Sequence, residues 1–383
     1  MQEMKSSKAP EFFPEVGDGK LGFGMMRLPS KGEEIDIETV KRMVDSYMQS
    51  GFRYFDTAHG YHSGKSELAV RQAVTERYER GSFVLTNKLS GGFIEKDSDV
   101  LPLFEEQLKA CGTEYFDFYL LHAVSSGNYR KFTDCRAFEI LGELKKQGKI
   151  RHMGCSFHDS AEFLDKVLTE HPELEVVQLQ LNYLDWEDKN VQSRQCYEVC
   201  VKHNKPVIVM EPVKGGSLAS LDSEANAILD SVRKDGDSNA SFALRFAAGP
   251  ENVMMVLSGM SSPEQMADNI SNLKEPRPLD KDEADALERI RGHYAALPLI
   301  PCTGCRYCVD GCPANIRIPE TLRFLNRQTM FPDPSRVSHE MRWLTEDHGA
   351  PEDCLNCSQC SDVCPQHIDI PALMKKAAEY RAG

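Results

Sequence analysis

The feature that most constrains this chain is a cysteine pattern that occurs twice near the C-terminus. Of the 13 cysteines, eight lie in its two copies, which are Cys302-x2-Cys305-x2-Cys308-x3-Cys312-Pro313 and Cys354-x2-Cys357-x2-Cys360-x3-Cys364-Pro365. In each copy, three closely spaced thiolates can cap three irons of one cubane, and the fourth thiolate points away. The spacing therefore predicts a segment folded around two [4Fe-4S] clusters.

In two-cluster folds, the fourth cysteine of each copy ligates the other cluster. We expect one cluster to be held by Cys302, Cys305, Cys308 and Cys364, and the other by Cys354, Cys357, Cys360 and Cys312. A pair of zinc sites is the alternative, because paired cysteines also bind zinc through four sulfurs. Zinc sites have no need of a third and fourth cysteine at this spacing followed by proline, so clusters are favoured.

The chain is long enough for a large domain beside this cysteine-rich segment. Of its 383 residues 41% are apolar, which is ample for one large core and a small second module. No signal peptide and no window approaching the ~20 apolar residues of a membrane span is visible, so we expect a cytoplasmic protein in a reducing compartment. The net charge of −14 argues against a nucleic-acid or anionic-membrane partner.

Short apolar runs alternate with longer amphipathic stretches through most of the chain. Eight runs are predicted as strands, at 22–25, 53–55, 83–86, 116–121, 150–154, 176–179, 206–210 and 253–257. Helical patterns lie between them, at 37–49, 66–77, 100–110, 135–147, 161–170, 191–202 and 263–272. Eight strands alternating with helices over roughly 250 residues predict an α/β fold, the (β/α)8 TIM barrel. An open doubly wound sheet is the alternative, but no GxGxxG segment follows the first strand.

The sequence also indicates where the domains begin and end. The barrel is expected over residues 1–275, a linker helix over 276–296 and the cysteine-rich domain over 297–383. Because 41 residues separate Cys312 from Cys354, far more than a minimal two-cluster ferredoxin needs, we expect helices between the motifs. The best candidate is 319–326, which gives a small, mostly α-helical ferredoxin-like domain.

Four polar side chains follow three consecutive predicted strands. Asp56 and Tyr61 follow the second strand, Lys88 ends the third and His122 ends the fourth. In a TIM barrel, such positions meet at the face where the active site is built. These residues are therefore candidates for a catalytic set.

The same segments carry a resemblance to a known family, the aldo-keto reductases. The matching residues are Phe55-Asp-Thr-Ala58, Tyr61, Glu67, Lys88 and His122, and the similarity extends from residue 21 to about residue 273. The segment Met25-Met-Arg27-Leu-Pro29 and the cysteine-rich end resemble the subtype with a C-terminal two-[4Fe-4S] ferredoxin-like domain. The resemblance implies an oxidoreductase that interconverts the carbonyl and alcohol forms of a small molecule by hydride transfer.

The chemistry gives each of the four side chains a role. Reduction of a carbonyl by hydride requires an acid that protonates the developing alkoxide. A phenol with its ordinary pKa of ~10 is a poor donor unless a neighbouring ammonium lowers that pKa. We therefore expect Lys88 beside Tyr61, with Asp56 neutralising and orienting Lys88 and with His122 holding the carbonyl oxygen. In the oxidative direction the same tyrosine acts as the base.

The resemblance also implies positions for a nicotinamide dinucleotide, NAD(P). They are Gly24 and Met25 at the first strand, Ser156 and Gln178 for the carboxamide, Pro212, Lys214, Gly216 and Leu218 in a pyrophosphate loop, and Gly259, Ser261, Gln265 and Asn269 at the adenosine end. Gly259 and Gln265 stand where many members carry basic residues for the 2′-phosphate of NADPH. NAD or mixed use is therefore favoured, although Lys214 could still meet a phosphate. The segment Ser156-Phe157-His158 also departs from the family, which usually has Ser-Asn after the fifth strand, so one of the amide contacts is not matched.

The clusters and the hydride chemistry do not combine directly, because nicotinamide gives two electrons and each cluster accepts one. Three interpretations stay open. The clusters exchange electrons with a redox partner protein while the barrel works with NAD(P), or FMN in the dinucleotide groove links hydride to the clusters, or the cysteine-rich domain is a docking element. A non-catalytic electron-transfer or redox-sensing protein is the alternative of another class, but it would not need the four polar side chains.

Overall fold

The computed structural model describes residues 13–17, 19–32, 34–309 and 311–382. The chain divides into two compact units. The first takes the residues up to Ala219 together with Val232–Ala284, and the second takes Ser220–Ser231 together with the residues from Asp285 onward. The short segment Ser220–Ser231 thus groups with the second unit although the barrel surrounds it in the sequence. The domain boundaries at 275 and 296 stay a prediction.

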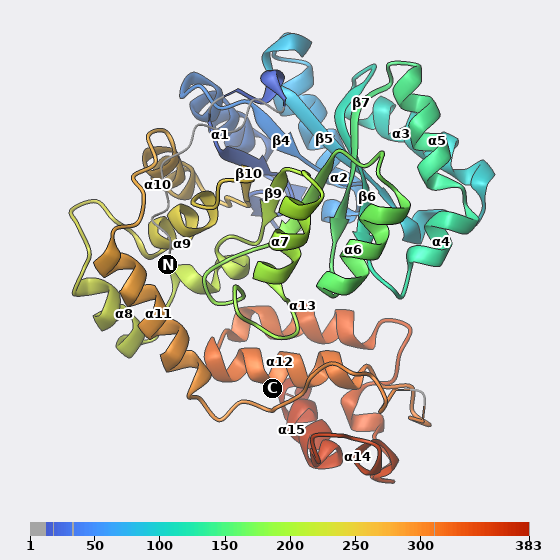
Figure 1. Ribbon diagram of the computed structural model, residues 1–383, viewed down its shortest axis with the longest axis vertical. Coiled ribbons are helices and arrows are strands. Elements are labelled where there is room, and N and C mark those ends of the chain that lie inside the picture. Colours follow the sequence, from blue (N-terminus) through green and yellow to red (C-terminus); the bar gives the residue numbers. More distant parts are fainter. Residues whose placement is uncertain (1–12, 18, 33, 310, 383) are drawn as a thin grey trace. The chain divides into compact units, whose positions relative to one another are not determined.

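The first unit is a closed barrel of eight parallel strands, which confirms the predicted TIM barrel (Figure 1). Around the barrel the strands follow the order β1-β10-β9-β8-β7-β6-β5-β4. Their bounds are β1 (Leu21–Gly24), β4 (Tyr54–Asp56), β5 (Val84–Ser90), β6 (Phe116–Val124), β7 (Ile150–Phe157), β8 (Val176–Gln180), β9 (Val207–Met210) and β10 (Val253–Ser258). A small antiparallel pair, β2 (Ser30–Lys31) and β3 (Glu34–Ile35), follows β1. Each of the eight predicted runs overlaps one strand of the barrel.

The strands are almost completely buried, as expected for a sheet that is covered on both faces. One apolar cluster includes Tyr54, Phe118, Leu120, Ile208 and Met255 from four strands. A second, larger cluster joins the other side chains of the strands to the surrounding helices. Packing on both faces of the sheet explains why the strands read as continuous apolar runs in the sequence.

Helices surround the barrel. They are α1 (Ile37–Gln49), α2 (Lys65–Val70), α3 (Val100–Cys111), α4 (Tyr129–Asp134), α5 (Ala137–Lys146), α6 (Ala161–Glu170), α7 (Ser193–Lys202), α9 (Asn239–Ala248) and α10 (Pro263–Leu273). The next helix, α11 (Lys281–Ala295), begins in the first unit and belongs mostly to the second. The helix predicted over 66–77 is two pieces, because α2 continues as a π-helical turn over Arg71–Thr75. The sequence did not reveal α9, since this helix is buried nearly all round and lacks the polar face that marks a surface helix.

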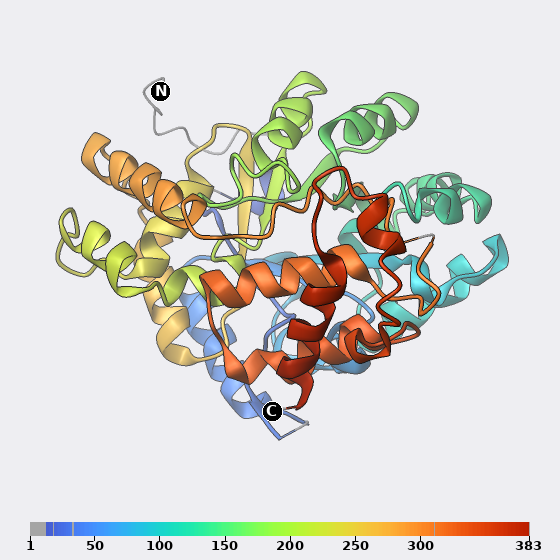
Figure 2. The ribbon, with the colours of Figure 1, turned by 90° about the horizontal axis from the view of Figure 1, so that it is seen from below.

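The second unit is mostly helical and matches the expected ferredoxin-like domain. Its helices are α8 (Ser223–Asp230), α12 (Ile318–Met330), α13 (Pro334–Thr345), α14 (Gln359–Asp362) and α15 (Ile370–Ala382). The predicted helix at 319–326 lies inside α12, whereas α13 was not predicted. Helix α15 crosses α12 and packs on it, and it also contacts α13 (Figure 2).

This unit contains an internal repeat that is longer than the cysteine motif. The segment from Cys302 to Pro319 matches the segment from Cys354 to Pro371, 52 residues later, and both end in Ile-x-Ile-Pro at the start of a long helix. The backbone repeats as well, because three pairs of equivalent residues all have positive φ. The pairs are Gly304 and Asn356, Arg306 and Ser358, and Asn315 and His367. The unit is therefore built from two copies of one loop-and-helix element.

Among the described residues, no helix has both the length and the apolar character that crossing a membrane requires.

Candidate functional site

Three of the four predicted catalytic side chains stand at the carboxyl ends of neighbouring strands. Asp56 ends β4, and Lys88 and His122 lie near the ends of β5 and β6. Tyr61 begins a short turn, Tyr61–Gly64, which follows β4. The barrel therefore brings together side chains that are up to 66 positions apart in the sequence.

Lys88 lies at the centre of this group. Its Nζ donates to Asp56 Oδ1 at 2.6 Å and to the carbonyl oxygen of Thr57 at 2.8 Å, and it lies 3.4 Å from Tyr61 Oη. Lys88 is only 1% exposed. Burial lowers the pKa of its ammonium, but Asp56 and Tyr61 overcome that effect and hold the pKa above its ordinary value. Lys88 is consequently a buried, permanent positive charge beside the phenol.

The Tyr61 phenol is affected by two opposing influences. Burial raises its pKa, and the neighbouring Lys88 lowers it by a smaller amount, so the pKa lies above its ordinary value. The lowering expected from the sequence is present but is outweighed. Tyr61 is thus a neutral phenol that can donate a proton, and Lys88 is placed to stabilise the phenolate left behind.

His122 completes the group from β6. Its ring packs edge-on against the Tyr61 ring, with 5.8 Å between the ring centroids. Its Nδ1 lies 2.6 Å from the Ser90 hydroxyl oxygen on β5. Burial lowers the pKa of His122 to about 3, with further lowering from Lys88 and His158. His122 is therefore an uncharged imidazole near neutral pH.

A buried polar network supports the backbone on which Lys88 lies. Glu67 Oε1 accepts hydrogen bonds from Asn87 Nδ2 at 2.8 Å and from Gln107 Nε2 at 3.0 Å. Its other oxygen, Oε2, lies 2.9 Å from His59 Nδ1. Gln107 Nε2 also reaches the Lys88 carbonyl oxygen at 3.1 Å. Glu67 and His59 thus brace the loop between Asp56 and Tyr61.

Two buried side chains match the two halves of a carboxamide. The Gln178 Oε1 atom is buried and accepts no hydrogen bond within the described part of the chain. The Ser156 hydroxyl oxygen accepts from the Ala123 N–H at 2.7 Å, which leaves its own proton to donate. One unsatisfied acceptor and one available donor on the adjacent strands β7 and β8 fit the amino and carbonyl groups of a nicotinamide carboxamide.

The predicted pyrophosphate loop follows β9 and has an unusual backbone conformation. Lys214, Gly215 and Gly216 have φ of 48, 64 and 98° in succession. The Lys214 and Gly216 N–H groups are used within the loop, where they donate to the Glu211 and Val213 carbonyl oxygens at 2.9 Å each. The Lys214 side chain is paired as well, because its Nζ lies 2.5 Å from the buried Asp185 Oδ1. Pro212 and Leu218 lie at the two sides of this loop in the sequence, and Leu218 is buried.

At the adenosine end, the structure reveals a cation that sequence reasoning missed. A Cβ on Gly259 would lie 3.2 Å from the Arg27 side chain, and the Ser261 hydroxyl donates to the Arg27 carbonyl oxygen at 2.7 Å. The Arg27 guanidinium is about two-fifths exposed and lies 3.8 Å from Glu211. Arg27 therefore occupies the space that a basic side chain at position 259 would fill. The two positions are 232 residues apart, so no local pattern could have revealed this.

The other residues predicted to contact the dinucleotide lie close to one another around the ends of β1 and β10. Gly24 faces the carbonyl oxygen of Ser258, which would lie 3.4 Å from a Cβ at this position. The Met25 N–H donates to the Asp56 carbonyl oxygen at 2.8 Å. Gln265 Oε1 accepts from the Ser261 N–H at 2.7 Å, and the buried Asn269 donates to the Ser258 hydroxyl at 2.7 Å. The Asn269 amide nitrogen is thus already engaged within the protein.

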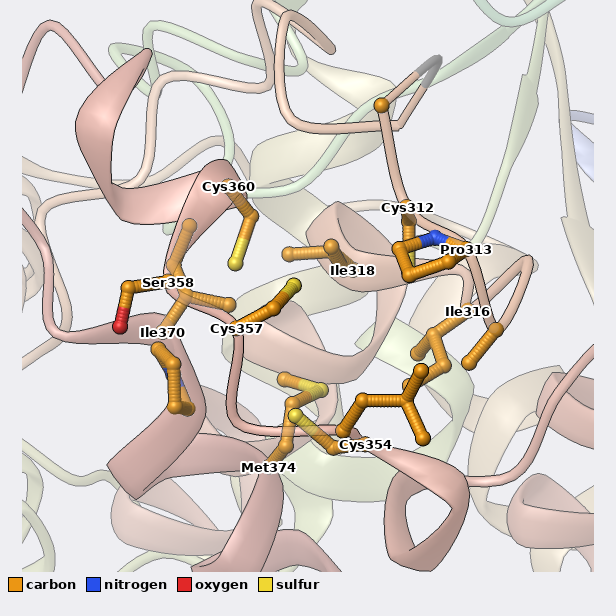
Figure 3. A pocket seen from close by; sticks show the side chains of 14 residues that line it. Cys312, Pro313, Ile316, Ile318, Cys354, Cys357, Ser358, Cys360, Ile370 and Met374 are labelled. Atoms are coloured by element: carbon orange, nitrogen blue, oxygen red, sulfur yellow. The ribbon is translucent and has the colours of Figure 1, made fainter.

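The eight motif cysteines gather around two separate pockets in the second unit. One pocket is lined by Cys312, Cys354, Cys357 and Cys360, together with Ile316, Ile318, Ile370 and Met374 (Figure 3). The other is lined by Cys302, Cys305, Cys308 and Cys364. These are the two crossed groups that the spacing predicted, so the fold groups the cysteines accordingly.

Each pocket thus brings together four cysteines, which is the ligand set of one [4Fe-4S] cluster. The remaining cysteines at 111, 135, 155, 196 and 200 are all buried, as expected for small apolar side chains.

Comparisons with known proteins match both parts of the chain. The model of the aldo/keto reductase family matches residues 20–291, and that of the 4Fe-4S dicluster domain matches residues 301–368. The NADH-specific methylglyoxal reductase of Escherichia coli is 24% identical and covers 74% of this chain and 99% of its own length. A methylglyoxal reductase of Salmonella typhi is 32% identical but covers only 36% of this chain and 46% of its own length.

Solved structures of other proteins are similar to the barrel part of this chain. The holo form of an aldo-keto reductase from Bacillus halodurans superposes with a TM-score of 0.58 at 23% identity, covering 71% of this chain and 91% of that chain. An aldo-keto reductase from Klebsiella pneumoniae in complex with NADPH also gives 0.58, at 19% identity, covering 71% and 90%. At these identities the structures support the fold alone. The family match to residues 20–291 covers well over half of the 383 residues, and the chain therefore belongs to the aldo/keto reductase family and carries a 4Fe-4S dicluster domain.

Proposed function

We propose that the barrel interconverts a carbonyl compound and its alcohol by hydride transfer, with Tyr61 as the general acid in reduction and the general base in oxidation. The observation that carries this proposal is the buried Lys88 ammonium, which joins Asp56 Oδ1 at 2.6 Å and lies 3.4 Å from Tyr61 Oη. A charge buried at this position is costly unless it is paired, and it is useful where a phenolate forms.

Each side chain then has one task during reduction. His122 donates a hydrogen bond to the carbonyl oxygen, on which negative charge develops. The Tyr61 hydroxyl gives its proton to that oxygen, and Lys88 stabilises the phenolate that results. Asp56 keeps Lys88 charged and oriented. In oxidation the same proton returns to Tyr61.

A bound nicotinamide dinucleotide supplies or accepts the hydride. Ser156 and Gln178 would orient its carboxamide, and the loop with Gly215 and Gly216 would hold the pyrophosphate. Arg27 offers a cation beside Gly259, where the sequence lacks a basic residue, so we propose that both NADH and NADPH are accepted. Both coenzymes occur among similar proteins, since one relative is named NADH-specific and one solved structure holds NADPH.

The names of two relatives suggest where to look for a substrate. Both are methylglyoxal reductases, which act on a small carbonyl compound. Small aldehydes and ketones such as methylglyoxal are therefore the first substrates to assay.

The decisive experiment replaces the proposed acid. We expect Tyr61→Phe to lower kcat for carbonyl reduction by about 10²–10⁴-fold, because general acid catalysis contributes that much. Coenzyme affinity, measured by fluorescence titration, should stay within about twofold, since Tyr61 is not among the proposed coenzyme contacts. Tyr115→Phe is the matched control, because this hydroxyl bonds Arg151 at 2.9 Å, away from the site. Unchanged turnover in Tyr61→Phe would show that the catalytic assignment is wrong.

For the second unit, we propose that two [4Fe-4S] clusters occupy the two cysteine pockets and exchange single electrons with a redox partner protein. The crossed grouping of the cysteines supports this proposal. FMN bound in the dinucleotide groove is the competing means of joining hydride to the clusters. Anaerobic purification followed by an absorption spectrum and release of bound cofactors distinguishes the two, because a flavin spectrum would replace the first proposal by the second.

A further inference from the structure

Ser90 is a buried hydroxyl beside the site that the proposed mechanism has not yet used. It lies two positions after Lys88 on β5, and alternate residues of a strand face the same side. The register pairs Ser90 directly with His122 on β6, and 2.6 Å separates its Oγ from His122 Nδ1. Lys88 and Ser90 therefore lie on the same face of β5. Lys88 contacts the Tyr61 hydroxyl, and Ser90 contacts the His122 imidazole.

We propose that the Ser90 hydroxyl fixes the tautomer of His122, so that Nε2 carries the proton and donates to the carbonyl oxygen of the substrate. This inference rests on the proposed function and makes Ser90 a positioning residue. An uncharged imidazole has one N–H and one bare nitrogen, and the partner of one nitrogen decides the state of the other. The Ser90 hydroxyl is therefore placed to set what His122 offers to the substrate.

The hydrogen-bonding capacity of Ser90 selects one of two arrangements. If the hydroxyl donates to Nδ1, its proton is satisfied and Nε2–H points away from β5. If the hydroxyl instead accepts from Nδ1–H, its own proton needs another acceptor, and within the described part of the chain its one hydrogen-bond partner is His122. Ser90 is 9% exposed, and an unmade hydrogen bond at such a position is unfavourable. The donating arrangement is consequently the stable one.

The backbone around His122 is held independently of Ser90. Ala123 has φ of 56°, an unusual value for a residue with a side chain, and the pairing of β6 with β7 shifts between Leu121 and Val124. The Ala123 N–H is bonded to the Ser156 hydroxyl, and its carbonyl oxygen accepts from Asn128 Nδ2 at 2.9 Å. These bonds fix the direction of the His122 side chain, which leaves the proton position as the property that Ser90 controls.

The charged groups near His122 keep its ring uncharged, so the tautomer decides which ring nitrogen can donate a hydrogen bond. Lys88 and His158 both disfavour a second proton on His122, and Tyr61 packs against the ring without an ionic charge. An imidazolium would donate from both nitrogens whatever Ser90 did. An uncharged ring with the proton on Nδ1 would turn a lone pair toward the carbonyl oxygen and repel it.

The test combines spectroscopy with kinetics on the iron-loaded protein. Nitrogen NMR of [15N]histidine-labelled protein, with His122 assigned among the 11 histidines by difference from His122→Gln, should show a protonated Nε2 and a hydrogen-bonded, bare Nδ1. In Ser90→Ala the two signals should move toward each other as the tautomers exchange. We expect kcat to fall about five- to tenfold, the effect of losing one ordinary hydrogen bond, with KM little changed.

Two further variants control the result. Ser90→Thr keeps the hydroxyl and should restore both the NMR pattern and kcat. Ser193→Ala removes another buried hydroxyl, which donates to the Gln180 carbonyl oxygen, and it should alter neither. A protonated Nδ1 in the wild type, or a Ser90→Ala protein with unchanged signals and kcat, would overturn the inference. If the tautomer behaves as expected while Tyr61→Phe retains turnover, the proposed function fails and the tautomer assignment stands.

Discussion

At the scale of the residue, burial decides which ionisable groups of this protein can do chemistry. Lys88 and Asp56 are almost fully buried and bonded to each other, so removing either partner would leave a buried charge without compensation. Breaking such a pair typically costs about 3–5 kcal/mol. The pair thus combines a structural requirement with the electrostatic role that we propose for it beside Tyr61, and stability must be measured alongside activity in any variant of either residue.

Glu175, just before β8, gives a prediction about pH. Burial raises its pKa, but hydrogen bonds from His152, Lys145 and the Met153 N–H outweigh burial and lower the pKa to about 2. A glutamate in the unfolded chain titrates near ~4.3. Its folded-state pKa is depressed, so the stabilisation is fully present above pH ~4.3 and is lost as the pH falls toward about 2.

We therefore expect Glu175→Gln to lower the urea midpoint at pH 7 and to differ less from the wild type at pH 3. Circular dichroism at both pH values measures this, and comparison with the wild type cancels acid damage that both proteins share. Glu143→Gln, which removes an exposed carboxylate on α5, should leave the midpoint unchanged. A pH-independent gap between Glu175→Gln and the wild type would contradict the linkage.

At the scale of the element, close approach of β7 and β8 depends on one glycine. A Cβ on Gly154 would lie 2.3 Å from the Val176 carbonyl oxygen and 2.6 Å from Val176 Cγ1. No side chain fits there without moving the strands. We expect Gly154→Ala to destabilise the protein by about 3 kcal/mol, at the upper end for an overpacked core.

A second glycine provides the matched control. Gly142 lies in α5 with no atom within 4 Å of an added Cβ. Because glycine is a poor helix former, Gly142→Ala should stabilise the protein by up to about 1 kcal/mol. Thermal unfolding of both variants measures the contrast, and equal melting temperatures for the two would show that the strand contact relaxes easily.

The elements also show what a sequence can and cannot predict here. All eight barrel strands were predictable, because covered parallel strands leave continuous apolar runs between polar connections. Helix α9 was not, since burial all round removes the periodic polar face. The catalytic candidates could be proposed because each lies at or soon after the end of a predicted strand. Ser90 and Arg27 were missed because their importance depends on strand register and on contact with Gly259, neither of which is local in sequence.

At the scale of the whole molecule, the crossed arrangement of cysteines makes the clusters separable by paired variants. If ligation is crossed, Cys302→Ser with Cys364→Ser damages one cluster and leaves about four irons, whereas Cys354→Ser with Cys364→Ser damages both. Uncrossed ligation predicts the reverse. Iron analysis with electron paramagnetic resonance distinguishes the two patterns, and Cys111→Ser, a buried cysteine of the barrel, should retain all the iron.

The internal repeat makes each cysteine pocket of the dicluster domain depend on both copies of the repeated element. Each copy contributes three cysteines to one pocket and a single cysteine to the other. One copy alone therefore lacks a complete set of cysteines for either pocket. A chain that ended between Met330 and Pro351 would keep three cysteines of one pocket and one of the other. The two copies therefore depend on each other, so a premature stop there would remove cysteines from both pockets at once.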